Sequence, residues 1–389
     1  MSAKKHTNSA YISHVHLKGY KSIIDTEVEL HPGLNIIIGP NGSGKTNFLE
    51  FLHKISSAQP NKIESEFEVK LKFYFKNKNN EYTYSVKKEL EVNDKTKKIE
   101  KKLKEKLVGG EQDIDSEREP DKSVNFFPIP NGFPDWKDLD SIIIRFGLPI
   151  KMQNLSQSLS FTVRVLNIGG DTNFTYTSYE FSPKITSGIE KILKDISSSI
   201  VYKKNDISIN SDLSFDEVKR NLKKFTPIKS VRIMPKLDLA KVNSYYRADY
   251  VNFEFSVENN WLKWNQLSDG TKRLFYIISE VTLNDGLCLI EEPEIGVHPN
   301  QYDKILNFLK EQAEEKQIII TTHSPRTLDI LEDEELDRII LTRYDRELGT
   351  KMRHLNEAEI KHAKNKEDGL FLSDLWTWTS FFDEEETVI

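Results

Sequence analysis

Apolar residues in the C-terminal part of the chain form short runs separated by stretches with helical periodicity. The runs at 287–290, 318–320 and 339–341 predict buried strands, and alternation over 251–257 predicts another. Apolar positions recur every three to four residues over 272–283 and 302–309, which predicts two amphipathic helices. Short all-apolar strands separated by helices are typical of a parallel sheet covered on both faces.

The N-terminal part has a different pattern, in which apolar and polar positions mostly alternate. Alternation predicts strands, and the turn residues between 75 and 82 predict a hairpin; the predicted strands are 11–17, 25–30, 64–75 and 82–90. A short apolar strand over 35–38 is followed by a helix whose apolar positions are Phe48, Leu49, Phe51, Leu52 and Ile55. We therefore expect an antiparallel sheet layered on the parallel core.

The middle of the chain is less regular. We predict strands at 141–146 and 160–166 and helices at 185–200 and 215–225, and we interpret the lysine-rich stretch 95–106 as a solvated helix. The predicted organisation is an N-terminal part of one core over 1–92 and an inserted region over 93–250. The core's C-terminal part over 251–345 and an acidic, aromatic segment over 346–389 follow.

Composition excludes several classes of protein. The 389 residues are 37% hydrophobic and 30% charged, with a net charge of −6, so a uniformly basic nucleic-acid coat is ruled out. The single cysteine, Cys288, excludes an internal disulfide. Apolar runs stay well short of the ~20 residues of a membrane span. We expect a cytoplasmic protein with no membrane partner.

A glycine-rich segment joins the strand at 35–38 to the helix after it. It matches the pattern G-x-x-x-x-G-K-[ST] with Gly39, Pro40, Asn41, Gly42, Ser43, Gly44, Lys45 and Thr46. Glycines let successive backbone N–H groups approach phosphate oxygens, and the helix N-terminus adds partial positive charge. Lys45 would reach the β/γ-phosphates and Thr46 would hold Mg²⁺. A chance glycine-rich turn is the alternative, which the flanking strand and helix disfavour.

Three later segments add polar residues at element ends. Ser268 and Gly270 open a predicted helix, Glu291 and Glu292 end one apolar strand, and His323 ends another. Together with the glycine-rich segment, they resemble ATP-binding-cassette ATPases of the soluble SMC/RecF/OLD type, also called AAA-like. The resemblance covers about residues 11–60 and 250–345. It implies an α/β P-loop NTPase fold, with a mostly parallel sheet, an antiparallel β-subdomain and an inserted α/β region.

The resemblance also implies site roles and cofactors, namely ATP and Mg²⁺. In that family two heads enclose two ATP molecules, so Ser268 and Gly270 would contact the γ-phosphate on the opposite subunit. Glu292 matches the catalytic base, Glu291 stands where the metal-supporting residue is usually Asp, and His323 matches the residue that contacts the γ-phosphate. Ser268 as a simple helix N-cap is compatible with this role. His298, in the following loop, is a candidate dimer contact.

Other candidates are less specific. Gln153 and Gln157 are candidates for a metal-sensing glutamine, and Tyr20 is a candidate for stacking on adenine. Lys21 could contact phosphate or adenine, or it could simply be an exposed lysine of a loop. The stretch 219–236 could bind nucleic acid or be a solvated face; it holds seven basic residues, Lys219, Arg220, Lys223, Lys224, Lys229, Arg232 and Lys236. Residues 367–389 contain seven acids and five large aromatic residues, Phe371, Trp376, Trp378, Phe381 and Phe382. We interpret this stretch either as a docking surface or as part of the core.

We expect an ATPase switch that dimerises, or forms a higher oligomer, and controls a separately encoded nuclease or toxin. The resemblance extends to anti-phage ATPases of Septu and PARIS-like systems. A RecF- or SMC-like DNA-binding ATPase is the alternative, although heptad runs long enough for coiled-coil arms are absent. An OLD-type nuclease is disfavoured because only about 45 residues follow Arg343. A transporter subunit is disfavoured by Glu291 and the missing glutamine motif.

Overall fold

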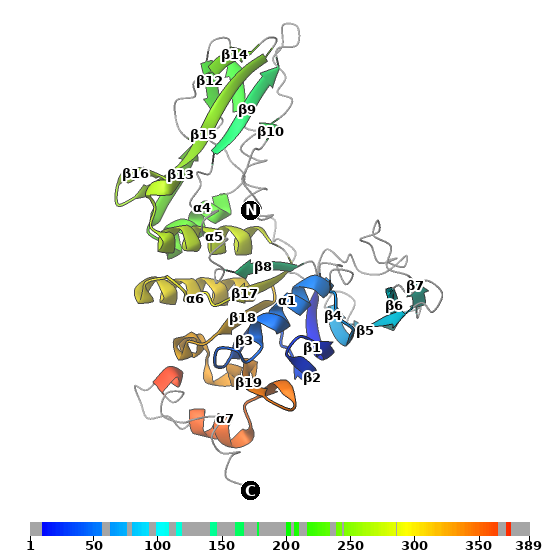
Figure 1. Ribbon diagram of the computed structural model, residues 1–389. Coiled ribbons are helices and arrows are strands. Elements are labelled where there is room, and N and C mark those ends of the chain that lie inside the picture. Colours follow the sequence, from blue (N-terminus) through cyan, green and yellow to red (C-terminus); the bar gives the residue numbers. More distant parts are fainter. Residues whose placement is uncertain are drawn as a thin grey trace. The chain divides into compact units, whose positions relative to one another are not determined.

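The computed structural model divides the chain into two compact units (Figure 1). The first unit comprises residues 1–145, 285–293 and 309–389, and the second comprises 146–284 and 294–308. The expected helix at 185–200, Gln153 and Gln157 lie outside the described residues. The residues that the structure describes are 10–56, 63–75, 80–92, 99–108, 114–118, 141–145, 160–166, 177–178, 200–203, 206–209, 216–233, 239–242, 245–284, 286–364 and 371–374.

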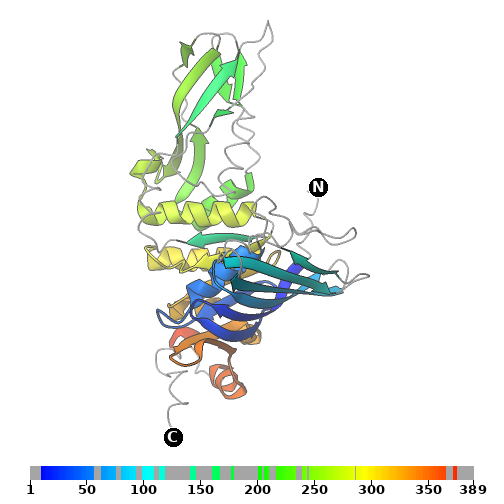
Figure 2. The same ribbon diagram turned by 45° about the vertical axis from the view of Figure 1, so that its right-hand side comes forward.

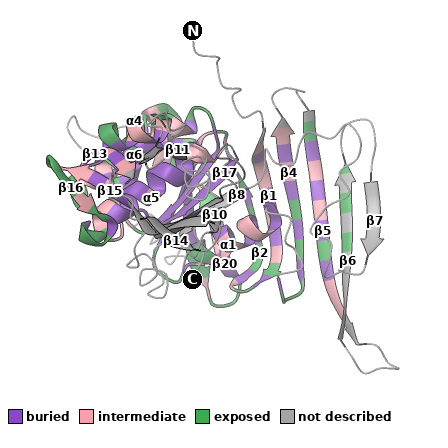
Figure 3. Cartoon of the chain, turned by 90° about the horizontal axis from the view of Figure 1, so that it is seen from above, coloured by how far each residue is buried: buried purple, intermediate pink, exposed green. Residues whose placement is uncertain are grey.

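The first unit is built on a sheet in the order β20-β19-β3-β18-β17-β8. Its strands are parallel except β20, which returns antiparallel to β19. All residues of β3, β17 and β18 are buried, as expected for apolar strands covered on both faces. Figure 3 shows β17 in the colour of buried residues. This confirms the predicted parallel core. The strands are β3 (Leu34–Ile38), β8 (Ser141–Arg145), β17 (Leu287–Glu291), β18 (Ile318–Thr322), β19 (Ile339–Asp345) and β20 (Gly349–His354).

An antiparallel sheet completes the first unit, in the order β2-β1-β4-β5-β6-β7 (Figure 2). Helix α1 (Lys45–Ser56) shares one apolar cluster with both sheets, through residues such as Phe48 and Phe51. The helix after the glycine-rich segment is thus held in the core. The strands are β1 (Ala10–Tyr20), β2 (Ile23–Glu29), β4 (Phe67–Phe75), β5 (Asn80–Val92), β6 (Ile99–Val108) and β7 (Ile114–Arg118).

The prediction of a solvated helix over 95–106 is wrong. Residues 99–108 form β6, which pairs antiparallel with β5 over ten residue pairs. The charges that suggested a solvated helix form contacts across strands instead, as in the 3.1 Å contact between Lys104 Nζ and Glu89 Oε2. The backbone ladder to β5 therefore overrides the local helical preference.

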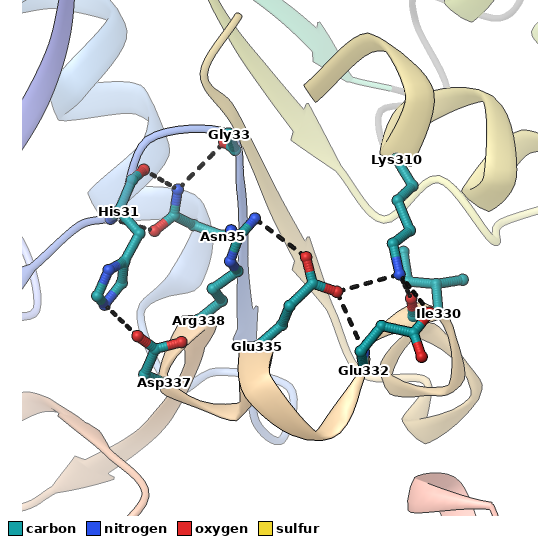
Figure 4. Close-up of polar contacts among 9 residues, drawn as sticks. All are labelled: His31, Gly33, Asn35, Lys310, Ile330, Glu332, Glu335, Asp337 and Arg338. Carbon is teal, nitrogen blue, oxygen red and sulfur yellow. Dashed lines mark hydrogen bonds and ion pairs between the residues drawn. The ribbon is translucent and has the colours of Figure 1, made fainter. Parts of the chain in front are cut away.

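A polar network fixes the turn before β3 and the segment before β19 (Figure 4). The Asn35 side chain accepts from His31 N and donates to His31 O, both at 2.8 Å. Lys310 Nζ donates to Ile330 O at 2.6 Å and contacts the carboxylates of Glu332 and Glu335 at 3.0 Å. Because β3 carries the glycine-rich segment, these contacts position its start. The helical elements here are α6 (Pro299–Ala313), which begins in the second unit, η4 (Pro325–Ile330), η5 (Asp333–Arg338) and α7 (Glu357–Lys364).

The second unit contains a long antiparallel strand and two packed helices. The strand, β15 (Tyr245–Val257), contains the predicted alternation at 251–257, and the expected helices at 215–225 and 272–283 are α4 (Asp216–Phe225) and α5 (Asp269–Leu283). The ring of Phe255 packs 5.1 Å from that of Phe275. The other elements are β9 (Ser160–Leu166), β10 (Thr177–Ser178), β11 (Ile200–Lys203), β12 (Asp206–Ile209), β13 (Ile228–Ile233), β14 (Leu239–Val242), β16 (Asn260–Lys263) and η3 (Trp264–Gln266).

Among the described residues, the helices are too short or too polar to cross a lipid bilayer.

Candidate nucleotide-binding site

The phosphate-binding loop (residues 39–46) connects β3 to α1 in a conformation that needs glycine. Gly42 and Gly44 have φ values of +81° and +99°, in the left-handed region that other residues rarely adopt. A Cβ atom on Gly44 would also overlap the Thr350 hydroxyl. The loop is therefore held both by its own backbone conformation and by a strand far along the chain.

Two side chains of the loop are buried beneath its surface. Lys45 Nζ donates to Gly39 O at 2.8 Å and to Pro40 O at 2.9 Å, so the ammonium lies under the arch of the loop. Ser43 is 1% exposed, and its hydroxyl has no hydrogen-bond partner in the described structure. An unsatisfied buried hydroxyl is costly, and a phosphate oxygen in the loop would satisfy it. The loop thus fits a polyphosphate.

A hydroxyl and amide cluster supports the loop from behind. Ser22 Oγ lies 2.8 Å from Thr350 Oγ1 and accepts from Asn47 Nδ2 at 2.7 Å. Thr350 N donates to Ser22 O at 2.8 Å. Sequence reasoning missed this support, because residues of separate segments meet only after both sheets have formed. The structure adds Ser22, Asn47 and Thr350 to the surroundings of the site.

The sheet order brings the acidic strand end to the loop. β18 lies between β3 and β17, so the carboxyl ends of the three strands share one edge. Glu291 is the last residue of β17, and its carboxylate accepts a hydrogen bond from the Thr46 hydroxyl. A hydroxyl facing a carboxylate supplies the oxygen ligands that Mg²⁺ prefers. The residues present therefore fit a magnesium ion between β17 and α1.

Glu292 and His323 meet at the same edge. The two side chains approach at 3.5 Å, measured from His323 Nδ1 to Glu292 Oε1, and they are 44% and 23% exposed. Glu292 has a φ of +46°, and its backbone N–H donates to Thr321 O at 2.8 Å. A non-glycine residue held in the left-handed region stores strain, which is typical of functional sites.

The turn that carries His323 is fixed by two buried threonines. Thr322 Oγ1 accepts from Ser324 N at 2.9 Å and from the Thr327 hydroxyl at 3.1 Å. In η4, just beyond, Asp329 accepts from the backbone N–H and the hydroxyl of Ser373 at 2.9 and 2.8 Å. Of residues 367–389, only 371–374 are described. These residues are thus anchored next to the His323 turn.

Ser268 and Gly270 lie in the second unit, at the N-terminus of α5. Ser268 is the N-cap: its hydroxyl accepts from Thr271 N at 3.2 Å, and its side chain is exposed. A Cβ on Gly270 would lie 3.0 Å from Gly296 O, so the helix start and the loop after Pro293 are closely packed. The N-cap interpretation is confirmed, and it leaves backbone donors facing solvent.

Arg273, one turn further along α5, holds that loop and was missed by sequence reasoning. It is 7% exposed, and its guanidinium donates to Ile295 O. Gly296 has a φ of +68°, and a Cβ there would lie 3.1 Å from Arg273 Cζ. Burial lowers the pKa of Arg273, and the charge of Asp269 opposes that shift. An arginine after S-D-G-T-K gives no local signal of a backbone partner 22 residues away.

The stacking role predicted for Tyr20 is wrong. The Tyr20 side chain is 2% exposed and packs against the Phe51 ring at a centroid distance of 5.0 Å, so its faces cannot receive a base. Lys21 is exposed and contacts Glu50 at 2.7 Å, and Lys54 contacts the same carboxylate at 2.8 Å. Partial burial alone would raise the pKa of Glu50, but these hydrogen bonds outweigh it and hold that pKa at about 2.

The basic stretch 219–236 is described up to residue 233, so Lys236 lies outside. Arg232 lies 3.8 Å from the centroid of the Trp261 ring and 2.8 Å from a Glu254 oxygen, and it is thus already engaged. His298 is exposed and accepts from Asn300 N at 3.3 Å, within its own turn.

A family model matches most of this site and fold. The family is described as "AAA domain, putative AbiEii toxin, Type IV TA system", and the match covers residues 34–329. That range includes the phosphate-binding loop, Ser268, Glu291, Glu292 and His323.

Individual relatives match over shorter stretches. An uncharacterised protein of Methanocaldococcus jannaschii is 36% identical over 70 residues, which are 18% of this chain and 17% of that protein. The DNA replication and repair protein RecF of Nocardioides sp. is 38% identical over 56 residues, 14% of this chain and 13% of RecF. A solved SMC head bound to the C-winged helix domain of ScpA shares 15% identity at a TM-score of 0.49, covering 90% of this chain and 99% of that one.

Proposed function

Because this chain belongs to the AAA_21 family of P-loop ATPase domains, we propose that it binds and hydrolyses ATP as a switch controlling a separate effector. The observation that carries the proposal is the meeting of a glycine-rich loop and two side-chain pairs at one sheet edge. The phosphate-binding loop, the Thr46–Glu291 pair and the Glu292–His323 pair all lie at the ends of β3, β17 and β18.

In the proposed reaction the loop binds the phosphates of ATP. Backbone N–H groups and Lys45 hold the β- and γ-phosphates, and the free Ser43 hydroxyl gains a phosphate partner. Thr46 and Glu291 would hold Mg²⁺, which when bound would neutralise charge on the phosphates. The longer Glu side chain, where an Asp is usual, still reaches the Thr46 hydroxyl.

Glu292 is the proposed general base. Its carboxylate takes a proton from the attacking water, while His323 donates a hydrogen bond to the γ-phosphate. Their separation of 3.5 Å keeps both groups close enough to act on one water and one phosphate oxygen. The strained backbone of Glu292 supports this role, since its side chain is aimed by the surrounding fold rather than by local preference.

The proposed switch is a dimer with shared sites. The exposed N-terminus of α5 offers Ser268 and backbone donors to an anion, and the partner subunit's bound γ-phosphate is the proposed ligand. ATP would then join two subunits and hydrolysis would release them, in the cytoplasm.

For the output, the toxin–antitoxin description of the family supports control of a nuclease or toxin, in anti-phage defence. A RecF- or SMC-like ATPase acting on DNA is the second candidate. It is supported by the short match to RecF and by the basic residues of α4, Lys219, Arg220, Lys223 and Lys224.

Glu292→Gln tests the switch. The amide keeps the shape of the side chain but cannot accept the proton, so hydrolysis should fall by at least about 100-fold while ATP binding persists. Light scattering should then detect a stable dimer with ATP and a monomer without it. Glu347→Gln, an exposed carboxylate in the β19–β20 turn, is the matched control. Hydrolysis at the wild-type rate would assign the base to another residue.

A further inference from the structure

Three exposed apolar side chains lie on β2 and the β19–β20 hairpin, two elements that contact the phosphate-binding loop or its supports. Ile24, Tyr344 and Leu348 are 53%, 53% and 55% exposed, and they belong to β2 and the β19–β20 hairpin. A Cβ on Gly349 would lie 2.9 Å from Ile24 Cγ1, so the hairpin turn packs directly on β2. Large apolar side chains left in water at one place indicate a surface that binds something.

The hairpin also touches the phosphate-binding loop at two points. Thr342 and Thr350 contact the backbone at Gly39 and Gly44, respectively, where a Cβ would overlap them. Tyr344 stands directly opposite Thr350 in the hairpin and two residues beyond Thr342, so the three side chains share one face. Paired residues lie about 5 Å apart, so the Tyr344 side chain extends the row formed by Thr342 and Thr350 beyond the phosphate-binding loop.

The strand β2 approaches the loop from the same side. Ser22, one residue before β2, contacts both Thr350 and Asn47, the third residue of α1. A nucleotide whose phosphates lie on the N-terminus of α1 must extend its ribose and base beyond the loop. The expected aromatic partner for that base, Tyr20, is buried.

We propose that Tyr344, Ile24 and Leu348 form the platform for the nucleoside of the nucleotide bound by the loop. This inference rests on the proposed function and adds to it a binding subsite for the base and the ribose. The phenol ring of Tyr344 would stack on the base, and Ile24 and Leu348 would pack against the base edge and the ribose. Stacking on a ring tolerates any base, so ATP and GTP should bind with similar affinity.

Calorimetry with ATP and inorganic tripolyphosphate tests the platform on the full chain. Tyr344→Ala should weaken ATP binding about tenfold, which corresponds to about 1.4 kcal/mol, and leave tripolyphosphate binding unchanged. Tyr344→Phe keeps the ring and should bind ATP like the wild type. Ile24→Ser with Leu348→Ser should weaken ATP binding in the same selective way. Thermal unfolding checks that each variant is folded.

The outcomes separate this inference from the proposed function. Wild-type affinity for ATP in Tyr344→Ala and in the double variant would overturn the platform and leave the phosphate-binding loop assigned. A changed oligomeric state with unchanged ATP affinity would also overturn it and assign the patch to contact with a second copy. A wild-type chain that binds neither ATP nor tripolyphosphate would overturn the proposed function, and the platform with it.

Discussion

Two helix N-termini of this protein look alike in sequence and differ in their surroundings. At the start of α1, Ser43 and Lys45 are 1% and 5% exposed, and the loop is packed against β19 and β20. At the start of α5, Ser268 and Asp269 are exposed, and the serine hydroxyl is occupied only by its own helix. Both ends offer backbone donors to an anion, but only the first is surrounded by other polar groups of a site.

The difference indicates what each end can do alone. The α1 end has a buried lysine, a carboxylate pair and a histidine nearby, so it can hold a phosphate and act on it. The α5 end offers exposed donors, and the acid beside them, Asp269, is paired with Lys272 of the same helix at 3.2 Å, so this end can complete a site but not constitute one. Three experiments test this contrast, and the first has the largest expected effect.

Mixing two inactive chains tests the division of labour. Lys45→Ala removes the charge under the loop, and Ser268→Arg blocks the α5 end; each variant alone should lose at least about 100-fold in ATPase activity. Mixed in equal amounts, the heterodimers contain one intact site, so activity should recover to roughly a quarter of wild type.

The controls follow from the same contrast. Ser268→Arg should still bind ATP in calorimetry, whereas Lys45→Ala should not. Lys54→Ala, on the same helix as Lys45 but paired with Glu50, should leave ATP binding intact. If the mixture stays inactive while both chains fold and associate, the site is built within one subunit.

Arg273→Ala tests whether the α5 end is held in place. The substitution removes a buried donor from Ile295 O and leaves that carbonyl unpaired, which should lower the free energy of unfolding by about 1–3 kcal/mol. Hydrolysis should fall while ATP binding to the isolated subunit stays unchanged. Denaturant unfolding and calorimetry measure the two effects. Arg220→Ala, exposed on α4, is the control, and an equal loss in that variant would refute a specific role for Arg273.

Glu50→Gln should have the smallest effect, and one that depends on pH. The pKa of Glu50 is about 2 in the folded chain and 4.5 for an ordinary Glu carboxyl, so the ion pairs with Lys21 and Lys54 stabilise the fold fully above about pH 4.5. That contribution is lost as the pH falls toward 2. The variant should therefore be slightly less stable than wild type at pH 7, by no more than about 1 kcal/mol because solvent screens the exposed Lys21 side of the cluster, and the difference should vanish near pH 2–3. A difference that widens in acid would contradict this assignment.

The sequence predicted those parts of the site that are contiguous in the chain. The phosphate-binding loop and the ends of β17 and β18 could be read because each combines an apolar strand with polar residues directly after it. Thr350 and Arg273 could not, since their roles depend on contacts with distant segments. The high lysine content misled the interpretation of residues 95–106 as a solvated helix, and Tyr20 was misjudged because the sequence around it does not reveal its burial.

The position of β18 between β3 and β17 sets the distance between the polar residues that follow these strands. Neighbouring strands are about 4.8 Å apart, so the backbone ends of β3 and β17 are about 10 Å apart along the sheet edge. His323 follows β18, the middle strand, and Glu292 follows β17, so the two side chains of this pair come from neighbouring strand ends. Side chains alternate between the two faces of a strand. A slip of β18 by one residue would therefore turn Thr321 and Thr322 each to the face opposite to the one it now occupies. Backbone hydrogen bonds such as those between β18 and β3 fix this spacing, so the backbone ladder determines how far apart the polar residues at the strand ends lie.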